Sequence, residues 1–493
     1  GDQRLGNLNT FDNGATGTIV EGQSLGKQEN EPKDPYARFD LEDLVTDGEK
    51  EKIAFRHYFV EVLRRHYPTF TPATVPPVEP IRRLGTKKTT AHPLPAMKID
   101  QSTVEGNLEI TNLSSAILRT HYGTSRTPGS VGYNIDMLSR KRLAKDKPNF
   151  HDADEMLRQT FDAMVLRLWQ NELGTDLEAI GTHMIETKSM QESIAMAVES
   201  LCEELCDVDS EIYQQTYGNA NTSAMLFIRD MLVYIELCAA IKQGDIGRIE
   251  HVLKTITIMF QSVATKNYAV HTLRLSQEIL CGWSETRKIA MLSSMLINTT
   301  GKDNSWIPSD LYQEHNNLLT KIRYAAGGSN RSWDYLDRSA SMNIRLFGDI
   351  QDMVETAFNV PHNSKYHKTV DATKDIKTIM NSLKSYHIFS NDGKRTPNDN
   401  DIIVSYDMYR SGFMNLHSGG RLSTFLESNS LRNILIADNN INPIGEQSGD
   451  VIIDNGDVNM ENADEEQDEG FDYSLFPIPI AAVSPNSEFS DVE

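Results

Sequence analysis

The chain has 493 residues, of which 24% are charged and 39% are hydrophobic, and its formal net charge is −22. This length predicts two or three domains and is sufficient to bury a sizeable core. The four cysteines are too few for the disulfide framework of a small secreted domain, and no signal-peptide pattern opens the sequence. Residues 225–241, the most apolar stretch, contain three charged residues, which excludes a membrane span there. We therefore expect an intracellular protein.

Most of the negative charge lies at the C-terminal end. Residues 433–493 contain 15 acidic residues and neither Lys nor Arg. Without these charges the net charge of residues 1–432 is only −7, so the overall acidity does not exclude a nucleic-acid partner.

Composition and hydrophobic spacing divide the chain into five predicted segments. They are an irregular N-terminal segment (1–35), a small α+β region with a Pro-rich connector (36–150), a helical core domain (151–390), a loop-rich segment (391–432) and a disordered acidic tail (433–493). The second segment is predicted to hold a helix over 47–67 and one strand within 93–107, the only strand we expect. Because the chain begins with Gly1 rather than methionine, we expect that further residues precede it.

Apolar residues recur with helical spacing from about residue 152 onward. One predicted stripe consists of Leu157, Phe161, Met164, Val165 and Leu168, and a second of Ile194, Val198, Leu201 and Leu205. We expect capping boxes at their starts, formed by Asp152 with Glu155 and by Thr175 with Glu178.

Further helices are predicted over 222–242, 245–261, 268–283, 285–297, 310–326, 333–358 and 371–386. Glycines 244, 282, 301, 327 and 328 stand where these helices should end. The predicted fold is mainly α, a multi-helix bundle with a small N-terminal α+β or irregular region and a disordered acidic C-terminal tail. An α-solenoid is the alternative, since GDIGRIEHVL (244–253) is typical of a helical-hairpin repeat, although no fixed period recurs.

Five stretches of the sequence are distinctive: DQRLGNLNTFDNGATGT, HPLPAMKIDQSTVEGN, RTHYGTSRTPGSVGYNIDMLSRKR, GDIGRIEHVLKTITIMFQSVATKNYA and LINTTGKDNSWIPSDLYQEHNNLLTKIRYAAGGSNRSWDYL. They resemble a group of fungal, basidiomycete-type proteins that share a domain of unknown function and are associated with mobile elements. The resemblance covers most of the chain up to about residue 360.

This resemblance implies no assigned activity. The family's pattern, in which aspartates end strands and a Glu follows on a late helix, is similar to that of RNase H-like transposases. Two acidic segments of the family pattern are missing here, so this copy looks truncated.

Under that transposase-like interpretation, Asp100 and Glu314 are the catalytic candidates that would bind Mg²⁺, with Glu105 and Asp310 nearby in sequence. The simpler interpretation makes Asp310 a helix N-cap completed by Gln313, and the acidic pair a solvated helix face. No other metal site or cofactor is predicted, and the pair Cys202 and Cys206 is expected to be buried as small hydrophobic residues.

Residues 119–147 carry the most basic local sequence, with a net charge of +5. Its candidate contact residues are Arg126, Arg140, Lys141, Arg142, Lys145 and Lys147. The rings of His121 and Tyr122 between them could contact a phosphate or a base. Three interpretations stay open: contact with a nucleic acid such as DNA, a nuclear-import signal in SRKRLAKDK, or a basic patch neutralised by neighbouring acids.

The tail contains a short apolar run beside dense acidic residues. Val451, Ile452, Ile453 and Asp454 resemble a SUMO-interacting motif, which would bind a SUMO-like or other nuclear protein by adding a strand to its sheet. A tail that only aids solubility is equally compatible. We predict a non-catalytic helical protein, nuclear if the import signal operates, that contacts protein or nucleic acid and has no evident small-molecule ligand. The alternative is a divalent-metal-dependent transposase or nuclease.

Overall fold

The computed structural model describes residues 39–46, 48–67, 78–85, 110–140, 148–173, 188–208, 211–263, 266–313, 371–389 and 396–427, with Leu143, Lys145 and eight single positions between 343 and 358. The predicted strand within 93–107, the segments 1–35 and 433–493, and the second capping box at Thr175 lie outside these described residues.

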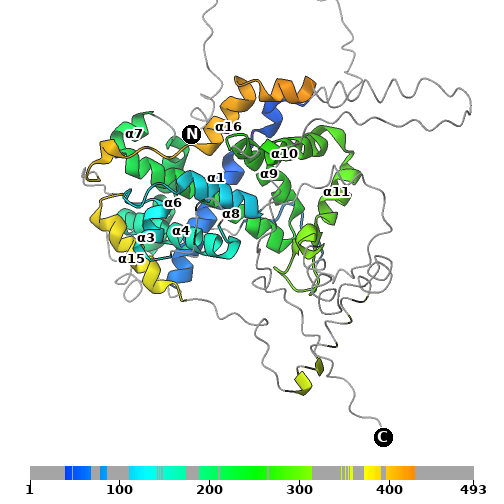
Figure 1. Ribbon diagram of the computed structural model, residues 1–493, viewed down its shortest axis with the longest axis horizontal. Coiled ribbons are helices and arrows are strands. Elements are labelled where there is room, and N and C mark those ends of the chain that lie inside the picture. Colours follow the sequence, from blue (N-terminus) through cyan, green and yellow to red (C-terminus); the bar gives the residue numbers. More distant parts are fainter. Residues whose placement is uncertain are drawn as a thin grey trace, which may run out of the picture.

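The described chain is built almost entirely of helices (Figure 1). In chain order they are η3 (Leu41–Leu44), α1 (Gly48–His66), α2 (Ile110–His121), α3 (Val131–Met137), α4 (Phe150–Leu173), α6 (Lys188–Asp207), α7 (Glu211–Tyr217), α8 (Asn219–Gln243), α9 (Ile246–Phe260), α10 (Lys266–Gln277), η5 (Glu278–Gly282), α11 (Glu285–Ser294), α15 (Thr373–Ser385), η7 (Asp399–Asp401) and α16 (Met408–His417). Two short antiparallel strands, β1 (Leu296–Ile297) and β2 (Ile307–Pro308), complete the described elements. The prediction of a mainly α fold is confirmed.

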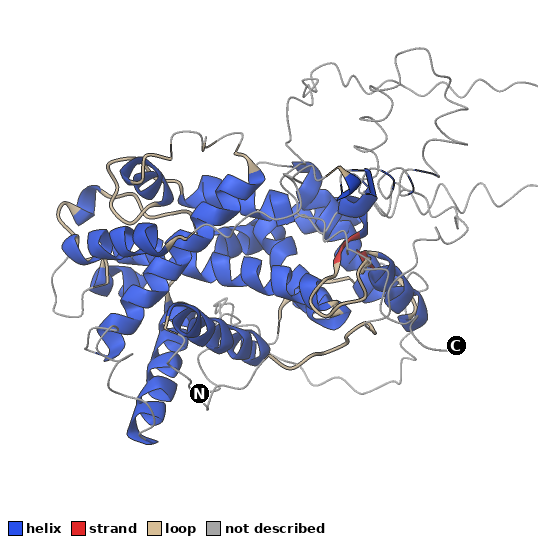
Figure 2. Cartoon of the chain, turned by 90° about the horizontal axis from the view of Figure 1, so that it is seen from below, coloured by secondary structure: helices blue, strands red, loops and turns tan. Residues whose placement is uncertain are grey.

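Helix α8 forms the centre of the bundle. Its 25 residues include buried side chains on every face, because the sequence is apolar all round rather than along one stripe. Helices α2, α4 and α9 pack directly against it, and α1, α6 and α7 also contact it. Figure 2 shows the described helices from below, with the two short strands at one side of them.

Packing between elements that are distant in sequence favours the bundle over the solenoid. Helix α15 packs against α4, and α16 packs against α9. In a solenoid each repeat contacts only its neighbours along the chain. One buried hydrophobic cluster contains side chains from Ala54 to Met408, so described parts of the predicted segments 36–150, 151–390 and 391–432 share a core.

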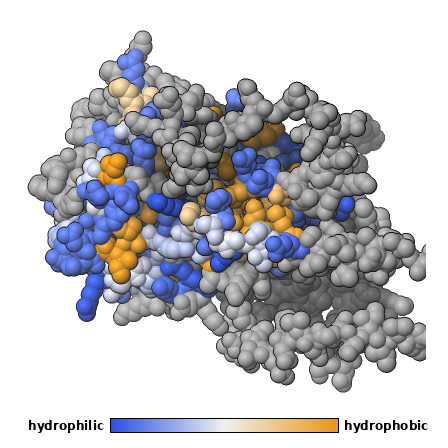
Figure 3. Space-filling model, turned by 90° about the horizontal axis from the view of Figure 1, so that it is seen from above, coloured by the Kyte–Doolittle hydropathy of each residue, from blue (hydrophilic) through white to orange (hydrophobic). Residues whose placement is uncertain are grey.

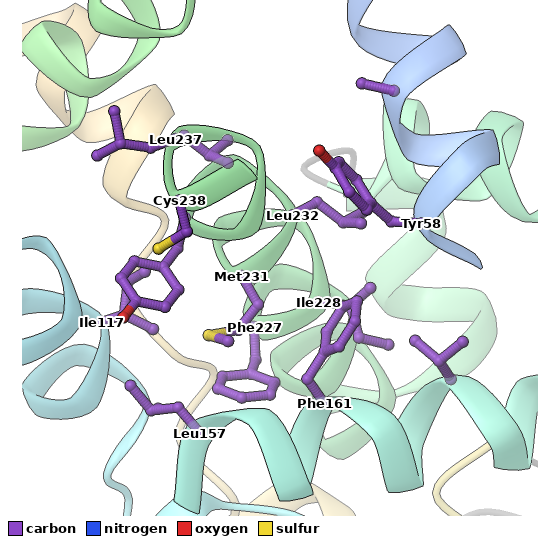
Figure 4. Packing of buried hydrophobic residues seen from close by; sticks show 14 of the residues in the cluster. Tyr58, Ile117, Leu157, Phe161, Phe227, Ile228, Met231, Leu232, Leu237 and Cys238 are labelled. Carbon is purple, nitrogen blue, oxygen red and sulfur yellow. The ribbon is translucent and has the colours of Figure 1, made fainter. Parts of the chain in front are cut away.

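The predicted apolar stripes are confirmed as core. All nine of their residues are buried, and they face α8 or its neighbours. In Figure 4, Phe227 of α8 lies above α4 between Leu157 and Phe161. Trp169 on the same helix donates its ring N–H to the carbonyl oxygen of Phe59 in α1, at 3.0 Å, so even this large side chain is both buried and hydrogen-bonded.

Two predicted helix boundaries are wrong. Helix α4 begins at Phe150, and the side chain of Asn149 accepts the backbone N–H groups of His151 and Asp152 at 3.0 and 3.3 Å. Asn149 therefore caps this helix, and the capping box of Asp152 with Glu155 does not form. Asp310 lies within the helical residues 309–313 instead of preceding them as an N-cap.

A small hairpin replaces the end of the helix predicted over 285–297. Helix α11 ends at Ser294, and Leu296 and Ile297 pair with Pro308 and Ile307. The prediction of a single strand in the chain, within 93–107, is therefore wrong, and Gly301 lies in the hairpin connection rather than at a helix end. Helices α2, α3, α7 and α16, which are only 7 to 12 residues long, are not predicted from the sequence, although Ile110, Leu113 and Ile117 of α2 do recur at helical spacing. Among the described helices, none has the length and apolarity needed to cross a membrane.

Candidate nucleic-acid interface

A tightly folded loop, residues 122–130, connects α2 to α3. The backbone N–H of Thr127 donates to the carbonyl of Thr124 at 3.0 Å, and that of Ser130 donates to the carbonyl of Thr127 at 3.2 Å. The loop therefore consists of two consecutive turns that meet at Thr127. The hydroxyls of Thr124 and Thr127 are 2.8 Å apart, and the Ser130 side chain accepts the N–H of Tyr133 and caps α3. These bonds hold the loop in one shape.

Two glycines are required for this loop. Gly123 has a φ of 60°, and a Cβ there would lie 2.5 Å from the Cβ of Ser130. Gly129 has a φ of 83° and lies against Ile388, just after α15. Positive φ values of this kind strain residues that carry a side chain. The glycines thus allow the loop to close and to dock on the C-terminal end of α15.

Three exposed basic residues lie in the loop or on segments that contact it or its neighbour α3, and we name them the basic loop surface: Arg126, Lys145 and Lys384. Arg126 is in the first turn of the loop. The ammonium of Lys145 lies 5.6 Å from the centre of the Tyr122 ring, a cation–π contact. Lys384 is in the last turn of α15, which the ring contact between Tyr133 and Tyr386, 5.8 Å between centroids, holds beside α3. No described carboxylate forms a salt bridge with any of the three.

Arg140, in contrast, is compensated by two acids. Its guanidinium donates to Asp375 of α15 at 2.7 Å and to Glu155 of α4 at 3.2 Å. The hydrogen bond to Asp375 is the main reason that its pKa is raised. This arrangement cross-links α4 and α15, as the neutralised-patch interpretation expects for this residue, and we leave Arg140 out of the basic loop surface.

The expectation that the His121 ring contacts a phosphate or a base is wrong. His121 is only 2% exposed, and its Nε2 lies 2.7 Å from the carboxylate of Asp230 in α8. Its ring also contacts Phe227 edge to face, with 5.4 Å between centroids. His121 therefore fastens the end of α2, immediately before the loop, to the central helix.

The remaining predicted site residues are distributed as follows. Asp100, Glu314, Lys141, Arg142, Lys147 and the motif Val451, Ile452, Ile453 and Asp454 all lie outside the described residues. Asp310 is described, and burial raises the pKa of its carboxyl. Within the described part of the chain, no group of three or more metal-binding side chains lies together.

The cysteines are mostly packing residues. Cys202 is buried as predicted, and burial raises the pKa of its thiol to about 12. Cys206 is exposed, so the prediction of burial is wrong for this residue. Cys238 is buried and Cys281 is half-buried. Because the thiolate is the nucleophilic form, a thiol with a raised pKa is a poor nucleophile, and Cys202 is not a candidate nucleophile.

A buried ionic cluster joins α1, α8 and α9 in the interior. Arg248 donates twice to Glu236, at 2.6 and 2.7 Å, and once to the hydroxyl of Tyr58 at 3.0 Å. The Tyr58 hydroxyl in turn donates to Glu236 at 2.6 Å, and burial raises its pKa. Every charge in this cluster has a partner, so its arrangement is that of a structural ion pair.

The surface seen in Figure 3 shows two groups of apolar side chains among hydrophilic ones. Apolar side chains are common on protein surfaces and do not by themselves identify a partner. The exposed and uncompensated charge of the basic loop surface is the more specific feature.

Comparison with known proteins gives one match. Residues 111–367 match the model of a family described as a family of unknown function (DUF6589), and this range contains the loop 122–130. No curated protein and no solved structure matches the chain.

Proposed function

The chain belongs to a family of unknown function (DUF6589), and from its own residues we propose that it contacts the phosphate backbone of a nucleic acid through the basic loop surface. The observation that carries this proposal is the contrast between similar residues. Arg140 forms salt bridges with Asp375 and Glu155. Arg126, Lys145 and Lys384, in contrast, are exposed to solvent and have no described acidic partner.

The chemistry of the surface suits phosphate. An arginine presents a planar fork of donors to phosphate oxygens, and a lysine adds a point charge. Because hydrogen bonds and glycines hold the loop in one shape, Arg126 is placed before a ligand arrives, which lowers the entropy cost of binding. Tyr122 beside Lys145 offers a ring next to the charge.

The expected magnitude follows from counterion release. Each phosphate contact on duplex DNA contributes a slope of about −0.9 to the dependence of log K on log salt. Three contacts therefore contribute about −2.7, and at physiological salt each contact raises affinity about fivefold. Loss of all three contacts should weaken binding about 100-fold.

The test measures fluorescence anisotropy of labelled duplex DNA against the full chain at several salt concentrations. The variant Arg126→Ala/Lys145→Ala/Lys384→Ala should lose about 100-fold in affinity and most of the salt slope. If the unchanged chain shows no affinity, or if the triple variant keeps the parent slope, the proposal fails.

Lys302→Ala is the control for the loss of an exposed lysine outside the basic loop surface. Lys302 lies in the β1–β2 connection, where the N–H of Trp306 donates to the carbonyl of Lys242 near the C-terminal end of α8. The basic loop surface lies nearer the other end of α8, where Asn221 donates to the carbonyl of Ile388 and where His121, just before the loop, contacts Asp230. Asp230 and Lys242, the nearest anchors of the two sites on α8, are 12 positions apart, which is about 18 Å along the helix. Affinity should not change in this variant.

Other parts of the proposal rest on sequence alone. The relation to fungal mobile elements, nuclear import through 139–147 and a SUMO-like partner for Val451 to Asp454 are proposals of this kind. The rival function is a Mg²⁺-dependent transposase or nuclease in which Asp100 and Glu314 bind the metal. Cleavage of DNA by the full chain with Mg²⁺, abolished by Asp100→Asn and by Glu314→Gln, would favour that rival.

A further inference from the structure

The sequence contains the tripeptide Arg-Thr-Pro twice, at 126–128 and at 395–397. The fold treats the two threonines differently. Thr127 lies at the junction of the two turns in the loop 122–130 and is partly exposed. Thr396 is only 6% exposed, and its carbonyl accepts the N–H of Asp399 at the start of η7. An enzyme that recognises only the tripeptide sequence would modify both threonines. An enzyme that also needs an accessible hydroxyl would modify Thr127 alone.

The environment of Thr127 suits modification of its side chain. Its hydroxyl is hydrogen-bonded to the hydroxyl of Thr124, which is itself exposed. Pro128 disfavours helical backbone at Thr127, and this residue lies where the two turns meet and outside any helix. Proline also has no backbone N–H that would be left unsatisfied there.

We propose that Thr127 is a phosphorylation site for a proline-directed kinase, and that its phosphate weakens nucleic-acid binding by the basic loop surface. The second half of this inference rests on the proposed function. In the transfer, the Thr127 hydroxyl oxygen attacks the γ-phosphorus of ATP and forms an O–P bond. The bond from that phosphorus to the β,γ-bridging oxygen breaks, ADP leaves, and the hydroxyl proton goes to the base of the kinase.

The phosphate on Thr127 would lower the positive charge of the basic loop surface. It adds about −1.5 to −2 charges next to Arg126. The Arg126 guanidinium can pair with this phosphate in place of a nucleic-acid phosphate. The surface charge of Arg126, Lys145 and Lys384 then falls by about two, equivalent to the loss of about two contacts, or about 30-fold in affinity at physiological salt.

The first experiment treats the folded full chain with a purified proline-directed kinase and Mg-ATP, followed by peptide mass spectrometry. Thr127 should carry phosphate and Thr396 should not, and Thr127→Val should remove one phosphate from the intact mass. The denatured chain is the matched control, in which Thr396 should become a substrate as well. Modification of Thr127 in the denatured chain alone, or equal modification of both threonines in the folded chain, overturns the inference.

The second experiment measures DNA affinity before and after kinase treatment. The phosphorylated chain should bind about 30-fold more weakly than the untreated chain, whereas the affinity of Thr127→Val should be the same before and after kinase treatment. If the untreated chain binds DNA but phosphate on Thr127 leaves the affinity unchanged, the regulatory half is refuted. If the untreated chain does not bind DNA, the proposed function and the regulatory half both fail, while the modification site is judged by mass spectrometry.

Discussion

The buried carboxylate of Asp245 accepts three backbone N–H groups, which come from the segment 78–85 and from the first turn of α9. Its removal offers the sharpest test of the fold. The side chain is fully buried and caps α9 by accepting the N–H of Arg248 at 3.1 Å. It also accepts the N–H of Ile81 at 2.9 Å and of Arg82 at 2.8 Å, which fastens the segment 78–85 to the bundle. Gly247 leaves room for this segment, since a Cβ there would lie 2.6 Å from Ile81.

The expected loss can be added up from these bonds. An N-cap replaced by alanine costs about 1 kcal/mol. Each hydrogen bond to a charged acceptor contributes about 1.5 kcal/mol at the low end, which is appropriate because Ile81 and Arg82 are partly open to water. Asp245→Ala should therefore lower the free energy of unfolding by about 4 kcal/mol. Asp245→Asn keeps one acceptor oxygen but turns an amide N–H toward a backbone N–H, so it should cost about half as much.

The assay is urea unfolding of the full chain, followed by far-ultraviolet circular dichroism. The urea concentration at the unfolding midpoint should fall, while the dependence of the unfolding free energy on urea concentration should stay constant. That combination would show that the substitution lowers stability without changing the surface exposed on unfolding. Ser284→Ala is the control, because Ser284 caps α11 through a single longer bond to the N–H of Arg287, 3.4 Å, and should cost about 1 kcal/mol or less. If Asp245→Ala costs no more than Ser284→Ala, the three-way role of Asp245 is refuted.

Two further predictions concern packing and titration. Gly412→Ala should destabilise the chain by at least about 2 kcal/mol in the same assay, since a Cβ at Gly412 would overlap the carbonyl oxygen of Ile258 where α16 crosses α9, and an unchanged midpoint would contradict this packing. Burial, with a smaller contribution from Glu172, raises the pKa of Glu204 to about 7, so the folded state holds this proton more tightly than the unfolded state. Stability from this group should be greatest below about pH 4.5 and should be lost as the pH rises to about 7, and Glu204→Gln should flatten the pH profile over that interval.

The fold class and the central helices could be predicted from spacing because burial imposes a period on apolar residues. The stripe from Leu157 to Leu168 is buried, and α8 is buried on every face, as its continuous apolar sequence requires. Helix boundaries are harder to predict from the sequence than the presence of a helix. Asn149 and Asp152 are equally good N-caps in sequence, and only the path of the chain decides between them.

The candidate site depends on the tertiary structure even more than the helix boundaries do. Sequence alone determined that residues 119–147 are basic and that an Arg-Thr-Pro tripeptide occurs twice. Only the tertiary structure decided that Arg140 meets Asp375, 235 positions away, that Arg126 keeps its charge at the surface, and that Thr127 is accessible while Thr396 is buried. The reason is physical: charge and hydroxyl chemistry belong to a residue, but desolvation and pairing depend on neighbours that folding brings from distant parts of the chain.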